Sequence, residues 1–212
     1  MSAKPAKLAG AVAALAALWL AMMLAGTGPF DHQLLHALYS VDTPAFRGAV
    51  ILVTNLGQWL VLVPLTLIGV GWLLYRGKAR PALLLLAITL IGRLLADLQK
   101  LAIGRHRPED EAHLVTVRDL SFPSAHAANT MVVFLSLALL VAPRRYRYLA
   151  VAIALAATAA VGITRPMLGV HWPSDVVGGW AFGAAWVLMM VALAERLGEA
   201  HSASSNSHGR GQ

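Results

Sequence analysis

Two histidines in this chain lie beside helix-forming stretches, in positions suited to acid–base or nucleophilic chemistry. The first, His126, ends the stretch PSAH and is followed by an apolar run. Pro123 suits the first turn of a helix, so free backbone N–H groups near Ser124 and Ala125 would point outward and could bind an anion. His126 in that turn could donate a proton to the bound group. A histidine that only caps the helix is the simpler explanation of this stretch taken alone.

The second histidine, His171, is followed four positions later by Asp175, at the start of another apolar run. A carboxylate at this spacing near a helix start can accept the ring N–H, which leaves the other ring nitrogen free as a nucleophile or base. Arg165 lies at the end of the preceding apolar run. Taken alone, the His-Asp pair has a structural explanation at least as often as a catalytic one.

Two further cations, Lys100 and Arg107, stand seven residues apart and would share one face of a helix that continued to Pro108. Two cations on one face suggest a bound anion, although both side chains could instead reach toward lipid headgroups. Arg93 and Asp97, four residues apart within the same apolar run, are predicted to pair and so lower the cost of charge inside a membrane. We favour this structural role for Arg93 and Asp97 over a supporting role beneath the predicted anion-binding site.

Composition indicates which elements must position these groups. The chain of 212 residues is 58% hydrophobic, its mean hydropathy is +0.66, and 13% of its residues are charged, about half the charged share of a soluble domain. Apolar runs long enough to cross a bilayer as helices are expected at residues 8–26, 50–75, 81–101, 123–142, 148–164 and 174–195. The predicted fold class is all-α, a polytopic membrane protein with six transmembrane helices in a bundle.

The positive charges indicate orientation and argue against a nucleic-acid partner. Ten of the 17 lysines and arginines lie near the N-terminus, at 76–80, at 144–147 and in the C-terminal tail, so these four segments and both termini are predicted to be cytoplasmic. The segments 27–49, 102–122 and 165–173 then share the outer face, which brings the histidine, carboxylate and phosphate-binding candidates in these segments and at the adjoining span ends to one side of the membrane. The first run could instead be a secretory signal, but its length and the lack of a convincing cleavage site favour an uncleaved span.

Two parts of the chain lie outside these spans. Phe30, Leu34 and Leu38 recur at helical spacing, which predicts a helix in the membrane interface between the first two spans, with His32 and His36 on its wet side. Residues 197–212 are polar and rich in small residues, and we expect a disordered cytoplasmic tail. Residues 1–196 are predicted to form a single domain with its functional core at about 50–195. The absence of cysteine excludes disulfides and thiolate chemistry.

The residues around His126, the group formed by Arg165, His171 and Asp175, and the pair Lys100 and Arg107 are three clusters that together suit one reaction. They contain two histidines, one carboxylate, three cations and a set of helix N-terminal N–H groups. Cations can hold the non-bridging oxygens of a phosphate while one histidine attacks the phosphorus and the other protonates the leaving oxygen. The sequence therefore predicts phosphoryl transfer through a phosphohistidine.

The spacing of these residues resembles that of the type 2 phosphatidic acid phosphatase superfamily, which contains integral-membrane lipid phosphatases. Its first motif, Lys, six residues, Arg-Pro, matches 100–108, and its second, Pro-Ser-Gly-His, matches 123–126 with Ala125 in place of Gly. Its third, Ser-Arg, five residues, His, three residues, Asp, matches 164–175 with Thr164 in place of Ser. All three motifs occur in order.

The resemblance implies a six-helix bundle and a hydrolase that needs neither a metal ion nor another cofactor. It implies His171 as the nucleophile, Asp175 as the residue that orients it and His126 as the general acid. The phosphate ligands that it implies are Lys100, Arg107, Ser124 and Arg165, with the backbone at Ala125. Since alanine fits a helical first turn and keeps its N–H donor, we expect phosphate binding to survive the change from Gly unless position 125 requires a positive φ.

The resemblance leaves the substrate open among lipid phosphates in a bacterial cytoplasmic membrane. The small chain favours undecaprenyl diphosphate, and phosphatidylglycerol phosphate, phosphatidate and lipid A phosphates are the alternatives. A lipid phosphotransferase would keep the same intermediate, whereas a transporter or lipid-binding protein would not explain why all three clusters share one face. The sequence does not indicate an oligomeric state.

Overall fold

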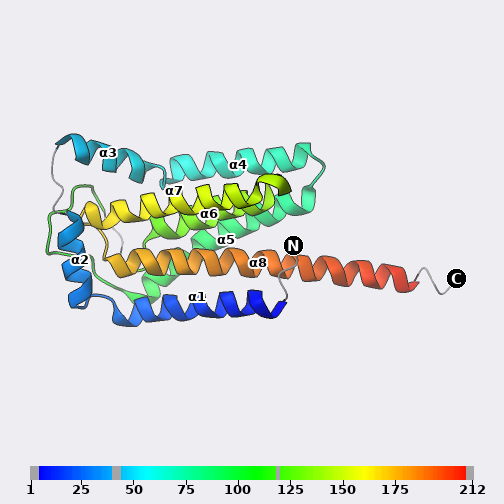
Figure 1. The fold of residues 1–212 in the computed structure, drawn as a ribbon, viewed down its shortest axis with the longest axis horizontal. Coiled ribbons are helices and arrows are strands. Elements are labelled where there is room, and N and C mark those ends of the chain that lie inside the picture. Colours follow the sequence, from blue (N-terminus) through cyan, green and yellow to red (C-terminus); the bar gives the residue numbers. More distant parts are fainter. Residues whose placement is uncertain (1–4, 40–43, 118–119, 209–212) are drawn as a thin grey trace.

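The described part of the chain is helical in all its regular structure. The computed structural model describes residues 5–39, 44–117 and 120–208. Its helices are α1 Pro5–Ala25, α2 Pro29–Tyr39, α3 Pro44–Asn55, α4 Trp59–Tyr75, α5 Ala79–Ile103, α6 Ala125–Leu140, α7 Arg147–Met167 and α8 Pro173–His208, with a short 3₁₀ turn at Arg144–Tyr146. The long helices run side by side, and α2 lies across one end of the bundle (Figure 1).

Helix α6 forms the centre of the bundle. It packs against α5, α7 and α8, while α1 packs along the outer side of α8. The core beside α6 contains Ile88, Met131, Val132, Leu135 and Val187, which come from three different helices. Because α6 is enclosed by its neighbours, most of its side chains are buried rather than exposed to lipid.

The contact between α6 and α8 requires glycine at two positions one helical turn apart. A Cβ at Gly179 would lie 2.8 Å from the carbonyl oxygen of Ser124, and a Cβ at Gly183 would lie 2.8 Å from the carbonyl oxygen of Ala128. These separations are shorter than any ordinary carbon–oxygen contact. The backbones of α6 and α8 can therefore approach closely, which brings the start of α6 against the start of α8.

The protein is a multi-pass membrane protein, but its helices differ from the six predicted spans. Four helices are long and apolar enough to cross a membrane, namely α1, α5, α7 with its preceding turn, and α8. Helices α3 and α4 qualify only as a pair bent by 41°. Helix α6 has 16 residues, about 24 Å at 1.5 Å per residue, which is short for a hydrocarbon layer of about 30 Å. By length and composition, the described residues therefore contain four candidate spans, or five if the bent pair counts as one.

The interrupted span at 50–75 and the shortness of α6 both have local causes. The run predicted as one span at 50–75 is interrupted at residues 56–58, where Gly57 and the polar side chains of Asn55 and Gln58 replace a regular helical turn. Helix α6 begins only after Ser124, because the backbone of Ser124 is extended and residues 122 and 123 form a bend outside the helix. The apolar run at 123–142 is therefore longer than the helix it forms.

The connections divide between the two ends of the bundle as the charge pattern predicts. The links α4–α5 and α6–α7 lie at the same end as the start of α1 and the far part of α8 (Figure 1). Helix α2, the segments 104–117 and 120–124 and the turn 168–172 lie at the other end (Figure 1). The helix predicted between the first two spans is present as α2, and the three predicted clusters share its end of the bundle.

The C-terminal region differs from expectation. Residues from 197 onward were expected to be disordered, but α8 continues to His208 and extends beyond the bundle (Figure 1). Serine, alanine and glutamate without proline do not break a helix that has already formed. The last predicted tail residues, 209–212, lie outside the described residues. The division of the chain into one domain and a tail stays a prediction.

Candidate active site

The predicted clusters meet at a cavity of about 290 Å³ at the α2 end of the bundle. Five of the predicted site residues line it, namely Arg107, Ala125, His126, Arg165 and His171. The remaining three surround this cavity. Asp175 contacts His171, Ser124 precedes Ala125 at the start of α6, and Lys100 lines a neighbouring cavity.

His171 is held between a carboxylate and a guanidinium. Its Nδ1 lies 3.3 Å from Oδ2 of Asp175, and its Nε2 lies 3.1 Å from Nη1 of Arg107. A guanidinium N–H can only donate, so Nε2 is the acceptor and the ring proton belongs on Nδ1, facing the carboxylate. The lone pair of Nε2 therefore faces the cavity side, where a phosphate would replace the Arg107 contact.

The surroundings of His171 keep its ring neutral. Burial lowers the pKa of His171 well below its usual range, and the nearby positive charges of Arg107, Lys100, Arg165 and His126 lower that pKa further. The side chain is almost fully buried. A neutral imidazole with a free Nε2 lone pair is the form that can attack an electrophile.

Asp175 is completely buried and hydrogen-bonded through both oxygens. Its Oδ2 accepts from the backbone N–H of Trp172 at 2.9 Å and from the hydroxyl of Ser121. Its Oδ1 accepts from Arg105 at 2.8 Å. The carboxylate is therefore fixed by three donors besides His171, and a fixed carboxylate fixes the orientation and tautomer of the imidazole.

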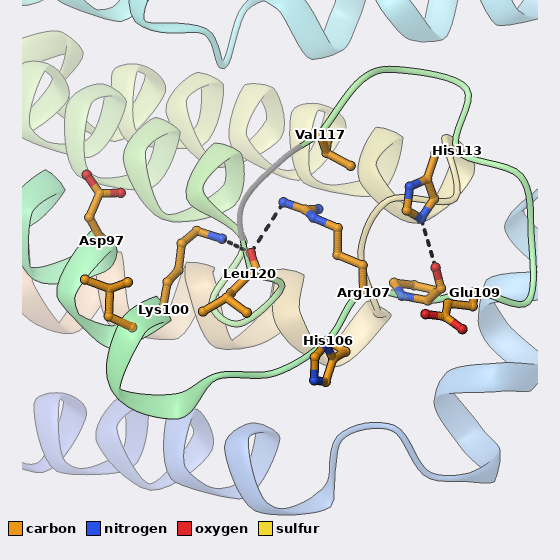
Figure 2. A pocket seen from close by; sticks show the side chains of 10 residues that line it. Asp97, Lys100, His106, Arg107, Glu109, His113, Val117 and Leu120 are labelled. Carbon is orange, nitrogen blue, oxygen red and sulfur yellow. Dashed lines mark hydrogen bonds between the residues drawn. The ribbon is translucent and has the colours of Figure 1, made fainter.

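The cations come from three separate segments. Arg165, near the end of α7, is buried and donates to Oγ1 of Thr54 on α3 at 2.8 Å. Arg107, in the segment after α5, also donates to the carbonyl of Val170, beside His171. Lys100 in the last turn of α5 is buried and donates to the carbonyl of Leu120, toward which Arg107 also points from the opposite side (Figure 2).

The start of α6 provides hydrogen-bond donors beside these cations. Ser124 is the N-cap residue, and the N–H groups of the first turn have no acceptor within the helix. The Ser124 hydroxyl is buried and has no hydrogen-bond partner among the described residues. Ala125 is the first residue of the helix, and its φ is not positive. Among the described residues, the non-glycine residue with a positive φ is Thr27. Position 125 therefore does not require glycine for its backbone conformation.

Comparisons with known proteins agree with this arrangement. Residues 81–199 match the PAP2 superfamily. The chain is 31% identical to phosphatidylglycerophosphatase B of Bacillus subtilis (strain 168), over 76% of this chain and 87% of that protein. The chain belongs to the PAP2 superfamily. It is therefore a lipid phosphatase of the metal-independent PAP2 type, a hydrolase that acts on a lipid phosphate.

Two further relatives extend the PAP2 assignment. The chain is 24% identical to an undecaprenyl-diphosphatase of Sulfolobus acidocaldarius, over 80% of each chain. The crystal structure of the first transmembrane PAP2 type phosphatidylglycerolphosphate phosphatase from Bacillus subtilis superimposes with a TM-score of 0.81 at 29% identity. That superposition covers 87% of this chain and 96% of the crystal structure. The likeness to a PAP2 crystal structure thus includes helices outside the matched segment 81–199.

A larger cavity of about 670 Å³ adjoins the 290 Å³ cavity. Arg107 and Val117 line both cavities. Lys100, Asp97, Glu109 and His113 contribute polar groups to the larger one, whose wall also contains Leu101 and Leu120 (Figure 2). Leu101 is 75% exposed on the outside of α5. The larger cavity therefore connects the cationic site with an apolar surface.

Sequence reasoning missed several partners of the PAP2 site residues. Arg105 and Ser121 contact Asp175, and Thr54 contacts Arg165. Arg105 lies within the six unspecified residues of the first motif, and Thr54 precedes all three motifs, so no spacing pointed to either. Ser121 lies two residues before Pro123 and outside all three motifs, so no spacing pointed to it either.

Other predicted features are present with partners that were not foreseen. Arg93 and Asp97 form the expected pair, 3.9 Å apart and about half exposed, and Asp97 also lines the larger cavity. The two α2 histidines were expected only to face water. His36 contacts the carboxylate of Glu111 at 2.6 Å, and His32 contacts Asp110, so α2 is tied to the segment after α5.

Proposed function

We propose that this protein removes a terminal phosphate from a membrane lipid through a phosphohistidine formed on Nε2 of His171. The observation that supports this most directly is the placement of His171, with Nδ1 toward Asp175 and Nε2 toward Arg107 and the cavity. A fixed, neutral imidazole directed at a cationic cavity suits in-line attack on phosphorus.

In the first step Nε2 of His171 attacks the phosphorus, and the bond from phosphorus to the leaving oxygen breaks. His126, which lines the same cavity, donates its proton to that oxygen. The positive charge that develops on the imidazole is stabilised by the carboxylate of Asp175. In the second step water attacks the phosphorus, His126 takes the proton of that water, and cleavage of the P–N bond restores neutral His171.

The phosphate oxygens would be held by the surrounding donors. Arg107 and Arg165 line the cavity, and the Ser124 hydroxyl and the N–H groups at Ala125 and His126 lie at the start of α6. Charge-assisted hydrogen bonds from guanidinium groups to phosphate are the strong ones. Lys100 completes the set if it exchanges the Leu120 carbonyl for a phosphate oxygen.

The rest of the headgroup would occupy the larger cavity. Glu109 and Asp97 can accept hydrogen bonds from hydroxyl groups, and Lys100 can pair with a second phosphate. The headgroup of phosphatidylglycerol phosphate contains both a hydroxyl group and a second phosphate, the phosphodiester. We therefore favour phosphatidylglycerol phosphate, the substrate named for the 31% identical Bacillus relative. This replaces undecaprenyl diphosphate as the first choice. Undecaprenyl diphosphate remains the second candidate, because a relative named for it aligns over 80% of this chain.

We further propose that the active end faces outward from a bacterial cytoplasmic membrane. The opposite end carries the basic links 76–80 and 144–147, together with the start of α1 and the far part of α8. Short basic loops stay in the cytoplasm. The lipid would then present its headgroup from the outer leaflet.

The test is phosphate release by the purified protein in detergent from a panel of lipids. The panel contains phosphatidylglycerol phosphate, undecaprenyl diphosphate, phosphatidate and a lipid A phosphate, each with and without an acceptor alcohol. Phosphatidylglycerol phosphate should give the highest kcat/KM, and His171→Ala should abolish release from every lipid because it removes the covalent route. Near-normal turnover by His171→Ala in a protein that elutes as a single folded species would contradict the proposed mechanism.

A further inference from the structure

Arg105 is a buried arginine outside the residues that the family motifs specify, yet it is hydrogen-bonded to the carboxylate beside the nucleophile. Its Nη1 donates to Oδ1 of Asp175 at 2.8 Å and to Oγ of Ser174 at 3.0 Å. Its guanidinium also stacks on the ring of Phe122, 4.4 Å from the centroid. Asp175 has no exposed surface, and Arg105 is 9% exposed.

The other half of the same guanidinium binds α1. Nη2 of Arg105 donates to the carbonyls of Met22 and Met23, at 3.0 and 2.6 Å. These carbonyls belong to the last turn of α1, where carbonyl groups lack partners within the helix and the helix dipole is negative. One planar group therefore joins the end of α1 to the carboxylate that faces His171.

A second link runs from α2 to the same point of α8. Asp31 in the first turn of α2 is buried and accepts from the backbone N–H of Ser174 at 2.9 Å and from its hydroxyl. The Asp31 carboxylate also accepts from the N–H of Thr27, in the connection between α1 and α2. Both N-terminal helices thus hold the first turn of α8, the turn that carries Asp175.

We propose that Arg105 is a positioning residue for catalysis, and that it uses the end of α1 as an anchor to hold the Asp175 carboxylate against His171. Asp175 needs a cation because a buried carboxylate without one is strongly disfavoured, and the cation nearest to its Oδ1 is Arg105. Arg107 does not serve this purpose, because it contacts Nε2 of His171, the ring nitrogen opposite the one that faces Asp175. This inference rests on the proposed role of His171, and it makes α1 a part of the catalytic apparatus, although α1 lies outside the segment 81–199 that matches the family.

Gly26 gives a way to disturb this contact from outside the site. A Cβ at Gly26 would lie 2.3 Å from Nη1 of Arg105 and 2.6 Å from its Cζ, and Gly26 has no positive φ that would itself disfavour alanine. The guanidinium would have to withdraw by about 1 Å to reach an ordinary contact distance. Gly10 on α1 has no atom within 4 Å of its Cβ position, so Gly10→Ala is the matched control.

The experiment measures kcat, KM and the inhibition constant of inorganic phosphate for purified variants. Arg105→Gln should lower kcat by about 10²-fold, the cost of misplacing a catalytic group by about 1 Å. Gly26→Ala should lower kcat by about tenfold or more, since a shift of about 1 Å in a catalytic group can cost 10²-fold. KM and the phosphate inhibition constant should change less than about threefold, because the phosphate ligands are untouched. Gly10→Ala should behave as the unmodified protein.

A double-mutant cycle separates positioning from general damage. If Arg105 acts through Asp175, adding Arg105→Gln to Asp175→Asn should cost little further activity. Multiplicative losses, or an Arg105→Gln variant with normal kcat, would overturn the inference. His171→Ala is measured in parallel: its inactivity with a normal Arg105→Gln variant would refute only this inference, whereas an active His171→Ala would refute the proposed function itself.

Discussion

Replacing Thr54 with valine should weaken phosphate binding, although Thr54 precedes every motif of the family. The Thr54 hydroxyl accepts a hydrogen bond from Nη1 of Arg165 at 2.8 Å, and both side chains are buried. Valine has nearly the same shape but no hydroxyl, so the substitution removes that acceptor and leaves the packing of α3 in place. Arg165 then lacks one of the contacts that hold its guanidinium toward the cavity.

The size of the effect follows from the kind of hydrogen bond that is lost. A hydrogen bond to a charged group contributes about 1.5–3 kcal/mol, and about 1.4 kcal/mol corresponds to a tenfold change in an equilibrium constant. If the contact orders Arg165 for phosphate, Thr54→Val should raise the inhibition constant of phosphate by about tenfold and at most about a hundredfold. KM for the lipid should rise in parallel, while kcat changes less.

The assay is competitive inhibition by phosphate together with steady-state phosphate release in detergent. Thr66→Val on α4 is the control, because the Thr66 hydroxyl is also buried but bonds to the carbonyl of Leu62 within its own helix. Thr66→Val should leave the phosphate inhibition constant unchanged. A well-folded Thr54→Val with unchanged KM and unchanged phosphate inhibition would show that Arg165 does not bind phosphate in the way described.

Two further predictions concern the histidines. His126→Gln should lower turnover of a lipid phosphate by about 10²- to 10⁴-fold, the usual value of a general acid, but should cost far less with nitrophenyl phosphate, whose leaving group needs no proton; equal losses would argue against the acid role. For His171, burial lowers the pKa in the folded protein, whereas the unfolded chain protonates near pH 6.5. The unfolded state therefore binds more protons below pH 6.5, and stability should fall with decreasing pH by up to about 1.4 kcal/mol per unit. Thermal unfolding at pH 7.0 and 5.5 should show a smaller loss of stability for His171→Gln than for the unmodified protein. Identical losses in the two proteins would show that His171 is not held neutral in the folded state.

The sequence allowed most of the fold to be predicted because hydropathy and charge act over whole segments. The segments that became α1, α5 and α7 and the start of α8 were expected within a few residues, and the helix α2 was expected between the first two spans, whereas α8 continues past its predicted end. The interruption at Gly57 was not expected, since the flanking residues are apolar enough for one continuous run. The length of α6 was overestimated for a related reason: hydropathy does not distinguish a Pro123 that lies in a bend before the helix from one in its first turn.

The site could be predicted where contacts depend on spacing along one helix or at its start. His171 and Asp175 meet because four residues near a helix start bring them together, as expected. Arg105, Ser121 and Thr54 reach the site through tertiary packing of segments that are distant in sequence, and no local pattern records such contacts. The roles assigned to all eight predicted residues stay predictions until the variants are measured.

The bend between α3 and α4 also bears on how the site obtains water. As one broken span, the pair places a non-helical joint within the apolar layer, and irregular backbone is tolerated there only inside protein or beside a hydrated cavity. Asn55 and Gln58 at this joint line the catalytic cavity, and the Cβ position of Gly57 lies 2.8 Å from the ring of His126. Two amide side chains of the joint thus lie on the cavity that contains His126, where they can hydrogen-bond the water that attacks in the proposed second step.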